Sequence, residues 1–285
     1  MSVQLANAYW TSAGPVDVHV GREWSQYDFA DRCAEAAKVG FVGLGLWHAD
    51  IEHQLENGRS LREMRQLLDD SGVRLYELEF LMDWFVDDDD RPAADRVRKL
   101  LFEAAVELDA HHIKAGNIPG KECEMGRLKE AYAELVADAA QHTSAKVLYE
   151  FMPFDVNVNS VDGALEVIDG IDNTGVVIDT WHMAKLGIKP DDLRRFGVER
   201  LGWIELSDGQ YEWMEDRIDE VVNRRKLPGE GEFDIRGYVE VALDMGYSEP
   251  WGVEVLSEDL RALPFDEMFR RAYESAAAQF EPVAA

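Results

Sequence analysis

The chain has 285 residues, 46% of them hydrophobic, so it is long enough to bury a large core. Its 57 acidic residues against 29 lysines and arginines give a formal charge of −28, which would repel nucleic acids and anionic membranes. No run approaches the roughly 18 apolar residues of a membrane span, the first residues do not resemble a signal peptide, and Cys33 and Cys123 form no CxxC pair. We therefore expect a cytoplasmic protein with no nucleic-acid or membrane partner.

Short apolar runs alternate with amphipathic segments along the chain. Strands are predicted at residues 3–10, 41–48, 73–81, 111–117, 146–152, 174–180, 201–207 and 251–256. Helices are predicted at 26–39, 58–71, 93–108, 125–142, 160–170, 190–196, 233–246 and 265–279. Most strands lack polar alternation, which is typical of parallel strands covered by helices. Eight such units predict an α/β fold, a (β/α)8 TIM barrel, as one domain over residues 1–285 with a frayed tail near 280–285.

Local signals support some of these boundaries. Ser60 precedes LREMRQLLDD with Glu63 three residues later, which predicts a capping box, and Gly72 is placed to cap the other end of that helix. The acidic run at 87–90 follows the third strand and reads as a solvated loop. Asp234 is suited to the N-cap of the helix that follows the loop KLPGEGEFD.

Acidic residues end four strands in the second half of the chain. Glu150 closes KVLYE, Asp179 closes TGVVID, Glu205 closes GWIE and Glu254 closes WGVE. A carboxylate at the end of an apolar run is costly to bury unless something offsets its charge. Because barrel active sites form where the strands end, we expect these four residues to bind one divalent cation. Four oxygen ligands suit Mn²⁺ or Mg²⁺ best, and Co²⁺ or Zn²⁺ could substitute.

These segments together resemble a known family. YEFMP, VVIDTWHMAK, GWIELSDG, LPGEGEFD and WGVEV are similar to motifs of the xylose-isomerase-like barrels, a superfamily of sugar phosphate isomerases and epimerases. It includes ketose 3-epimerases, hydroxypyruvate isomerases, and inosose and dehydroshikimate dehydratases. The resemblance covers about residues 146–256, and the first half matches only in its strand–helix rhythm. The superfamily's endonuclease IV branch is disfavoured, because its sites use several His ligands and DNA binding needs a basic surface.

The resemblance implies roles for particular residues. Glu150, Asp179 and Glu254 match the family's metal-binding positions. Position 205 is usually His in the family, so Glu205 would either make the metal site more anionic or act as a base. Glu150 and Glu254 would also be the catalytic pair that removes and returns an α-proton through a metal-stabilised enediolate. His182 would hold a substrate oxygen or shuttle a proton.

The implied activity is a metal-dependent isomerase or epimerase acting on a keto-sugar, polyol or related hydroxy-carbonyl substrate. If a β-substituent leaves instead, the enzyme is a lyase, such as a dehydratase of a cyclitol or cyclohexanone derivative, with His182, His48 or Glu79 as the acid. A barrel that binds without turnover, or one that needs a partner subunit, is a third alternative suggested by Glu205. The family also allows a homo-oligomer.

Aromatic residues crowd the predicted rim of the barrel and suggest a pocket with large apolar walls. The chain shows no glycine-rich phosphate loop, so a small unphosphorylated substrate is expected, either linear or ring-bearing. Lys114, near the end of the fourth strand, could pair with a substrate oxyanion. The residues predicted to bind substrate are Trp10, Trp47, His48, Glu79, Lys114, Trp181 and Asp208.

Overall fold

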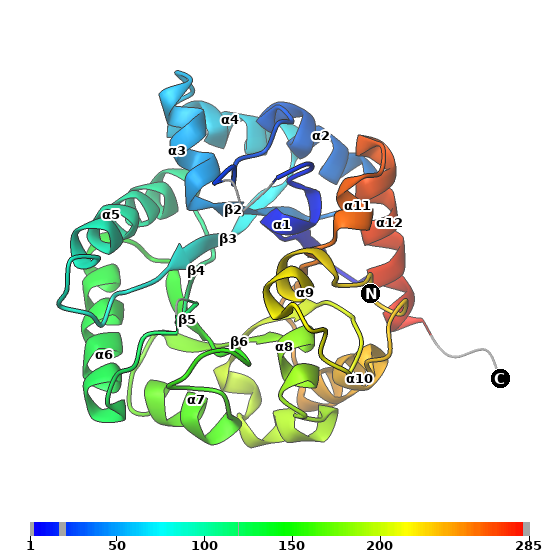
Figure 1. The fold of residues 1–285 in the computed structure, drawn as a ribbon. Helices are drawn as coiled ribbons and strands as arrows, with labels where there is room; N and C mark the ends of the chain where they lie inside the picture. Colours follow the sequence, from blue (N-terminus) through cyan, green and yellow to red (C-terminus); the bar gives the residue numbers. More distant parts are fainter. Residues whose placement is uncertain (1–2, 17–20, 119, 282–285) are drawn as a thin grey trace.

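A computed structural model describes residues 3–16, 21–118 and 120–281, and it shows a closed barrel of eight parallel strands (Figure 1). Each strand pairs with its neighbours in chain order, and β8 pairs with β1 to close the ring. The strands are β1 (Leu5–Asn7), β2 (Gly43–Trp47), β3 (Arg74–Leu81), β4 (His112–Ala115), β5 (Lys146–Glu150), β6 (Thr174–Asp179), β7 (Leu201–Leu206) and β8 (Trp251–Val253). The predicted (β/α)8 barrel is confirmed.

Helices surround the barrel and bury its outer face. The α-helices are α1 (Tyr9–Ser12), α2 (Phe29–Val39), α3 (His48–Glu56), α4 (Leu61–Ser71), α5 (Arg91–Leu108), α6 (Met125–His142), α7 (Val161–Ile168), α8 (Thr180–Lys185), α9 (Arg217–Asn223), α10 (Ile235–Met245), α11 (Glu258–Arg261) and α12 (Phe265–Ala277). The 3₁₀ helices of the described residues are η2 (Pro190–Arg195), η3 (Val198–Arg200) and η4 (Ala278–Phe280). Among the described residues, no helix is long and apolar enough to cross a lipid bilayer.

The inside of the barrel is layered, because side chains alternate between the two faces of each strand. One layer is apolar and contains Ala6, Tyr76, Leu148, Val177 and Trp203. Two residues further along their strands, Leu148, Val177 and Trp203 are followed by Glu150, Asp179 and Glu205. The period of two therefore places a layer of carboxylates directly above an apolar floor, at the C-terminal end of the barrel.

A glycine on β8 makes room for this layer. A Cβ atom added at Gly252 would lie 2.7 Å from Trp203 Nε1 and 2.8 Å from Glu205 Cγ. Strands β7 and β8 pair Glu205 with Gly252, so any larger residue there would collide with the floor and with the acidic layer at once. The glycine is thus a packing requirement of the site.

The predicted helix signals are confirmed. Ser60 Oγ accepts from Glu63 N at 3.3 Å, and Glu63 Oε2 accepts from Ser60 N at 2.8 Å, which completes the capping box of α4. Gly72 ends that helix in the left-handed conformation, with φ 75°. Asp234 caps α10 by accepting from Gly237 N at 2.9 Å.

Two further predicted segments lie at the periphery. The acidic run at 87–90 is exposed, and Lys121 Nζ contacts Asp88 at 3.3 Å and Asp90 at 2.5 Å. Part of the tail expected to fray, residues 282–285, lies outside the described residues. Before it, residues 278–280 form η4.

Candidate metal centre

Four carboxylates meet at the C-terminal end of the barrel. One oxygen each from Glu150, Asp179, Glu205 and Glu254 lies within 4.8 Å of the others, as the sequence predicted. All four side chains are buried. The strand register brings them together, because Asp179 pairs directly with Glu205 across β6 and β7. Oxygen ligands at this spacing are able to share one divalent cation.

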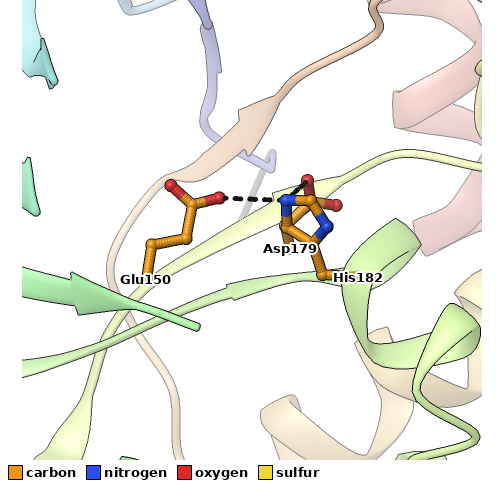
Figure 2. Close-up of side chains that lie close together, drawn as sticks. All are labelled: Glu150, Asp179 and His182. Atoms are coloured by element: carbon orange, nitrogen blue, oxygen red, sulfur yellow. Dashed lines mark ion pairs between the residues drawn. The ribbon is translucent and has the colours of Figure 1, made fainter. Parts of the chain in front are cut away.

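His182 lies beside two of these carboxylates (Figure 2). Its Nε2 atom is 3.5 Å from Glu150 Oε1 and 3.5 Å from Asp179 Oδ2. The placement follows from the local sequence: Asp179 ends β6 and also caps α8, where its Oδ1 accepts from Trp181 N at 2.8 Å. Residue 182 lies one helical turn after the cap and therefore on the same side. Glu150, Asp179 and His182 form a second group able to hold a metal ion.

A buried lysine reaches into the acidic layer from β4. The Lys114 side chain is 1% exposed, and its Nζ atom lies within 4.0 Å of five carboxylates. These belong to Glu77, Glu79, Glu150, Glu205 and Glu254. The shortest contacts are to Glu254 Oε1 at 3.0 Å and to both oxygens of Glu205 at 3.1 Å.

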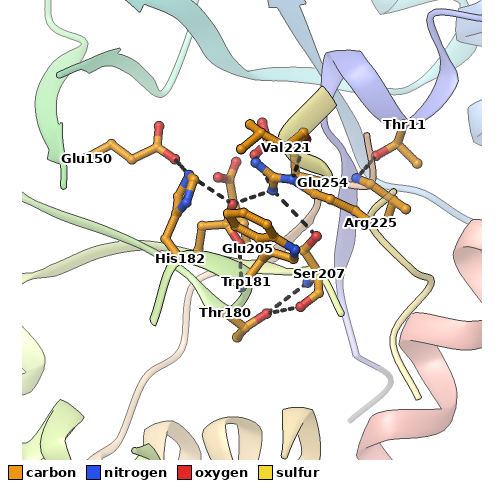
Figure 3. Close-up of polar contacts among 12 residues, drawn as sticks. Thr11, Glu150, Thr180, Trp181, His182, Glu205, Ser207, Val221, Arg225 and Glu254 are labelled. Atoms are coloured by element: carbon orange, nitrogen blue, oxygen red, sulfur yellow. Dashed lines mark hydrogen bonds and ion pairs between the residues drawn. The ribbon is translucent and has the colours of Figure 1, made fainter. Parts of the chain in front are cut away.

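A buried arginine also contacts the carboxylates (Figure 3). Arg225 Nη1 donates to Asp179 Oδ2 at 2.6 Å and to Glu254 Oε2 at 3.3 Å. Its guanidinium carbon lies 4.9 Å from the ring centroid of Trp181, a cation–π contact. Sequence reasoning missed both Arg225 and Glu77. Arg225 sits in a run of three basic residues, and nothing in that run distinguishes a buried side chain from a solvated one.

The cluster holds more negative charge than these two cations offset. Burial raises the pKa of Glu254 to about 7, and it raises the pKa of Glu79 and of Glu205 well above the ordinary value. Burial also disfavours ionisation of Glu150, but Lys114 and His182 outweigh it and lower the pKa of that carboxyl.

This imbalance is what a divalent cation would correct. The Oε1 atom of Glu79 is buried without a hydrogen-bond partner among the described residues. A cation or a hydrogen-bond donor bound nearby would satisfy this atom. The carboxylate donors, their spacing and their excess charge all fit a hard divalent ion. The residues present therefore suit the metal predicted from the sequence.

A cavity of about 460 Å³ opens above the carboxylates. Four of the predicted substrate-binding residues line it, namely Trp10, Trp47, His48 and Glu79. The candidate ligands and catalytic residues Glu150, His182 and Glu254 also face it, together with Arg225. Its apolar walls come from Phe80, Met82, Ile118, Met152, Phe154, Val221, Val222 and Leu256. The cavity thus combines a charged base with aromatic and aliphatic walls.

Three residues predicted to bind substrate lie behind the cavity wall. Trp181 is fully buried and packs edge-on against Trp213, with Arg225 over its ring. Lys114 lies among the carboxylates and does not line the cavity. Asp208 is fully buried and accepts from four backbone N–H groups. The structure therefore places these three side chains where they would affect a substrate only through their neighbours.

Asp208 holds the glycine-rich loop in place. Its Oδ1 accepts from Gly209 N at 2.7 Å and Phe233 N at 3.0 Å, and its Oδ2 accepts from Gly229 N at 2.9 Å and Gly231 N at 3.0 Å. A Cβ atom at Gly231 would lie 2.2 Å from Asp208 Oδ1, so only glycine allows this approach. The loop from residue 226 to residue 233 is thereby tied to the end of β7.

A closed parallel barrel with carboxylates and a cavity at the C-terminal strand ends is the architecture of a barrel enzyme, with its reactive groups where such barrels carry them. The chain belongs to the xylose isomerase-like TIM barrel family, whose model matches residues 33–278.

Proteins similar to the chain in sequence include a dehydratase and an isomerase. The chain is 23% identical over 237 residues to 3-dehydroshikimate dehydratase from Pseudomonas putida (strain KT2440), covering 80% of this chain and 36% of the relative. It is 26% identical over 154 residues to inosose isomerase from Bacillus licheniformis, covering 51% of this chain and 52% of the relative. The chain thus spans only 36% of the length of the dehydratase and about half that of the isomerase.

The fold is similar to that of a solved structure of the IolI protein with a bound zinc atom. The TM-score is 0.78 at 16% sequence identity, with 97% of this chain and 98% of that chain covered. At this identity the likeness concerns the fold.

Proposed function

We propose that the chain is a divalent-metal-dependent isomerase or epimerase acting on a keto-sugar, polyol or related hydroxy-carbonyl substrate. The observation that carries the proposal is the convergence of four buried carboxylates within 4.8 Å, two of which, Glu150 and Glu254, line the cavity. Glu150, Asp179, Glu205 and Glu254 would hold the cation, and the oxygen donors favour Mn²⁺ or Mg²⁺. A cation there would polarise a substrate carbonyl and make the adjacent α-proton more acidic.

Glu150 and Glu254 differ in pKa, as expected of a pair that removes and returns a proton. The lowered pKa of Glu150 keeps it ionised and able to accept an α-proton. In the metal-free site burial raises the pKa of Glu254 to about 7, so this carboxyl exchanges a proton near neutral pH more readily than an ordinary glutamate. The two residues come from the end of β5 and from just after β8, so they approach the site from different strands (Figure 3). His182 stands beside Glu150 and is placed to bind a substrate oxygen.

The cavity suits an uncharged substrate. Among the described residues that line it, Arg225 is the one lysine or arginine near the carboxylates, and its guanidinium already contacts Asp179 and Glu254. A phosphate or carboxylate on the substrate would therefore lack a free cation and would meet a strongly acidic base. Trp10 and Trp47, whose ring centroids lie 5.0 Å apart, offer an apolar wall to a sugar or cyclitol ring.

A lyase is the second candidate, and Glu79 favours it. Burial raises the pKa of Glu79 well above its ordinary value, so this cavity-lining residue carries a proton that could be donated to a leaving hydroxyl. Glu150 would take the α-proton, the C–O bond would break, and water and a carbon–carbon double bond would form. The similarity to a dehydratase supports this alternative.

We also infer a cytoplasmic setting with small molecules as partners. Cys33 and Cys123 are both unpaired, as expected in a reducing compartment. The formal charge of −28 makes a nucleic acid an unfavourable partner.

The test is exchange of an α-proton with solvent. The Mn²⁺-loaded protein is incubated in D₂O with a panel of ketoses, inososes and cyclic hydroxy-ketones, and the products are followed by NMR. We expect deuterium at the α-carbon of a substrate, with a rearranged product for an isomerase and an unsaturated one for a lyase. Glu150→Gln should slow the exchange by at least about 100-fold, because an amide cannot act as the base.

Glu56→Gln provides the matched control, because this glutamate is exposed at the end of α3. Its exchange rate should equal that of the unmodified protein. If the protein binds Mn²⁺ but no member of the panel acquires deuterium, the enzyme proposal fails and a barrel without turnover is favoured.

A further inference from the structure

We propose that Lys114 is a built-in cation that neutralises Glu205 and thereby limits the affinity of the metal centre for divalent ions. The inference rests on the proposed function, because it assigns a role to a residue in contact with the candidate metal ligands. It concerns a positioning residue, since Lys114 does not line the cavity.

The contacts between the two side chains carry the first step. Lys114 Nζ lies 3.1 Å from each oxygen of Glu205, a symmetric arrangement in which both carboxylate oxygens face the ammonium. Glu205 is fully buried, and Lys114 is 1% exposed. When Glu205 is ionised, as it must be to bind a cation, it and the ammonium form a pair whose net charge is zero.

The position of Arg225, the second buried cation of this cluster, leaves Lys114 as the counter-charge of Glu205. Arg225 contacts Asp179 and Glu254, and no contact between Arg225 and Glu205 occurs among the described residues at hydrogen-bond distance. Glu205 therefore depends on Lys114 for its counter-charge. Glu205 can still be a metal ligand, because a carboxylate has about four lone-pair directions and the ammonium occupies only some of them.

The same ammonium opposes a metal ion. It lies 3.0 Å from Glu254 Oε1 and 3.7 Å from Glu150 Oε2, so it sits among the oxygens that would bind the cation. Two positive charges a few ångströms apart repel strongly where water is excluded. Lys114 should therefore weaken divalent-ion binding by offsetting one of the negative charges that attract the ion.

The Mn²⁺ affinities of four proteins test this charge balance. The proteins are the unmodified chain, Lys114→Met, Glu205→Gln and the double variant, and isothermal titration calorimetry gives the dissociation constant and stoichiometry of each. Lys114→Met should bind Mn²⁺ at least about tenfold more tightly, and Glu205→Gln at least about tenfold more weakly. The double variant, which lacks both charges, should return to within about threefold of the unmodified protein.

The outcomes separate the possible failures. If the unmodified protein binds no Mn²⁺, the metal centre and hence the proposed function fail. If Mn²⁺ binds but Lys114→Met leaves the affinity unchanged or weaker, Lys114 is only a structural partner and this inference is wrong. A double variant at least about 100-fold weaker than the unmodified protein would also overturn it, because the Glu205 charge would then be indispensable. Should Lys114→Met not fold without metal, the comparison of Glu205→Gln with the double variant decides alone, since adding Lys114→Met must tighten binding about tenfold.

Discussion

His48 is an imidazole that stays neutral because of where it is buried. It follows β2 and lines the cavity, with its ring centroid 4.5 Å from that of Trp47. Burial lowers its pKa from 6.5 to about 4. Its Nδ1 atom is buried and has no hydrogen-bond partner among the described residues, so a substrate hydroxyl or carbonyl could satisfy it. A neutral ring is suited to bind such a group in a site that is already highly charged.

The lowered pKa of His48 predicts that this residue by itself makes the protein less stable in acid. A folded-state pKa below the unfolded one means that the unfolded chain takes up the proton first. The contribution is therefore complete above about pH 6.5 and is lost as the pH falls towards 4. Between about pH 7.5 and pH 5, His48 should account for a loss of about 2 kcal/mol in the free energy of unfolding.

Urea unfolding of the metal-free protein and of His48→Gln at both pH values measures the effect. The variant should lose about 2 kcal/mol less than the unmodified protein, because glutamine does not titrate. Equal losses in the two proteins would show that His48 is not held neutral.

Among the elements, the loop from 226 to 233 is ordered by one carboxylate and not by packing alone. Asp208 accepts four backbone N–H groups from the two segments that it joins, and Asp208 and Lys226 also form an antiparallel bridge. Arg225 directly precedes this loop, next to the Asp208–Lys226 bridge, so the anchor also helps to position the cation that contacts Asp179. The order of this loop and the charge of the metal centre are therefore linked.

Asp208→Asn should loosen this loop. An amide keeps one acceptor oxygen but turns an NH₂ group towards N–H donors, so about two charge-assisted hydrogen bonds are lost, at a cost of roughly 2–4 kcal/mol. Hydrogen–deuterium exchange of residues 227–233 should become much faster, and the melting temperature should fall.

Asp234→Asn is the matched control, since it makes the same substitution one residue beyond this loop. Asn is about as good as Asp at a helix N-cap, so this variant should change neither exchange nor melting appreciably. If Asp208→Asn behaves like the control, the loop is held by contacts other than the carboxylate.

The long elements could be predicted from the sequence because their signals are local. Apolar runs of five to eight residues define most strands, and the Ser60 capping box marks α4. The short helices α1, α3, α8, α9 and α11 were not predicted, because they have four to nine residues and too few turns for a periodic pattern.

The candidate site shows the same division. Glu150, Asp179, Glu205 and Glu254 could be predicted to converge, since a barrel brings all its strand ends to one rim. The positions of Lys114 and Arg225 could not be predicted, because an ion pair inside the barrel depends on partners far away in sequence. Lys114 and Glu205, for example, are 91 residues apart. Whether the Lys114 side chain lines the cavity or is buried behind its wall depends on the strand register, which the sequence does not specify.

At the scale of the whole molecule, charge is the dominant feature. The formal charge of −28 is spread over a surface on which most ion pairs are exposed, and such pairs contribute little. Mutual repulsion among the unpaired carboxylates therefore opposes the compact state.

Salt should stabilise the protein by screening this repulsion. Raising NaCl from about 20 mM to about 300 mM shortens the screening length from roughly 20 Å to about 6 Å, and the melting temperature should rise by about 5 °C. Little further rise is expected up to about 1 M, which distinguishes screening from a general salting-out effect that continues to grow. Differential scanning calorimetry of metal-free protein would record the curve, and a flat or falling profile would contradict the prediction.

A threonine near the start of the chain links α1 to the last strand of the barrel. Thr11 Oγ1 donates to Val253 O and accepts from Val255 N, both at 2.7 Å, so α1 is tied to β8 across more than 240 residues of chain. Glu254 lies between those two contacts. During synthesis on the ribosome, the carboxylate cluster therefore stays incomplete until residue 254 has emerged and reached the first strand. Loading of an ion at the complete centre must follow translation of the barrel and cannot guide its early steps.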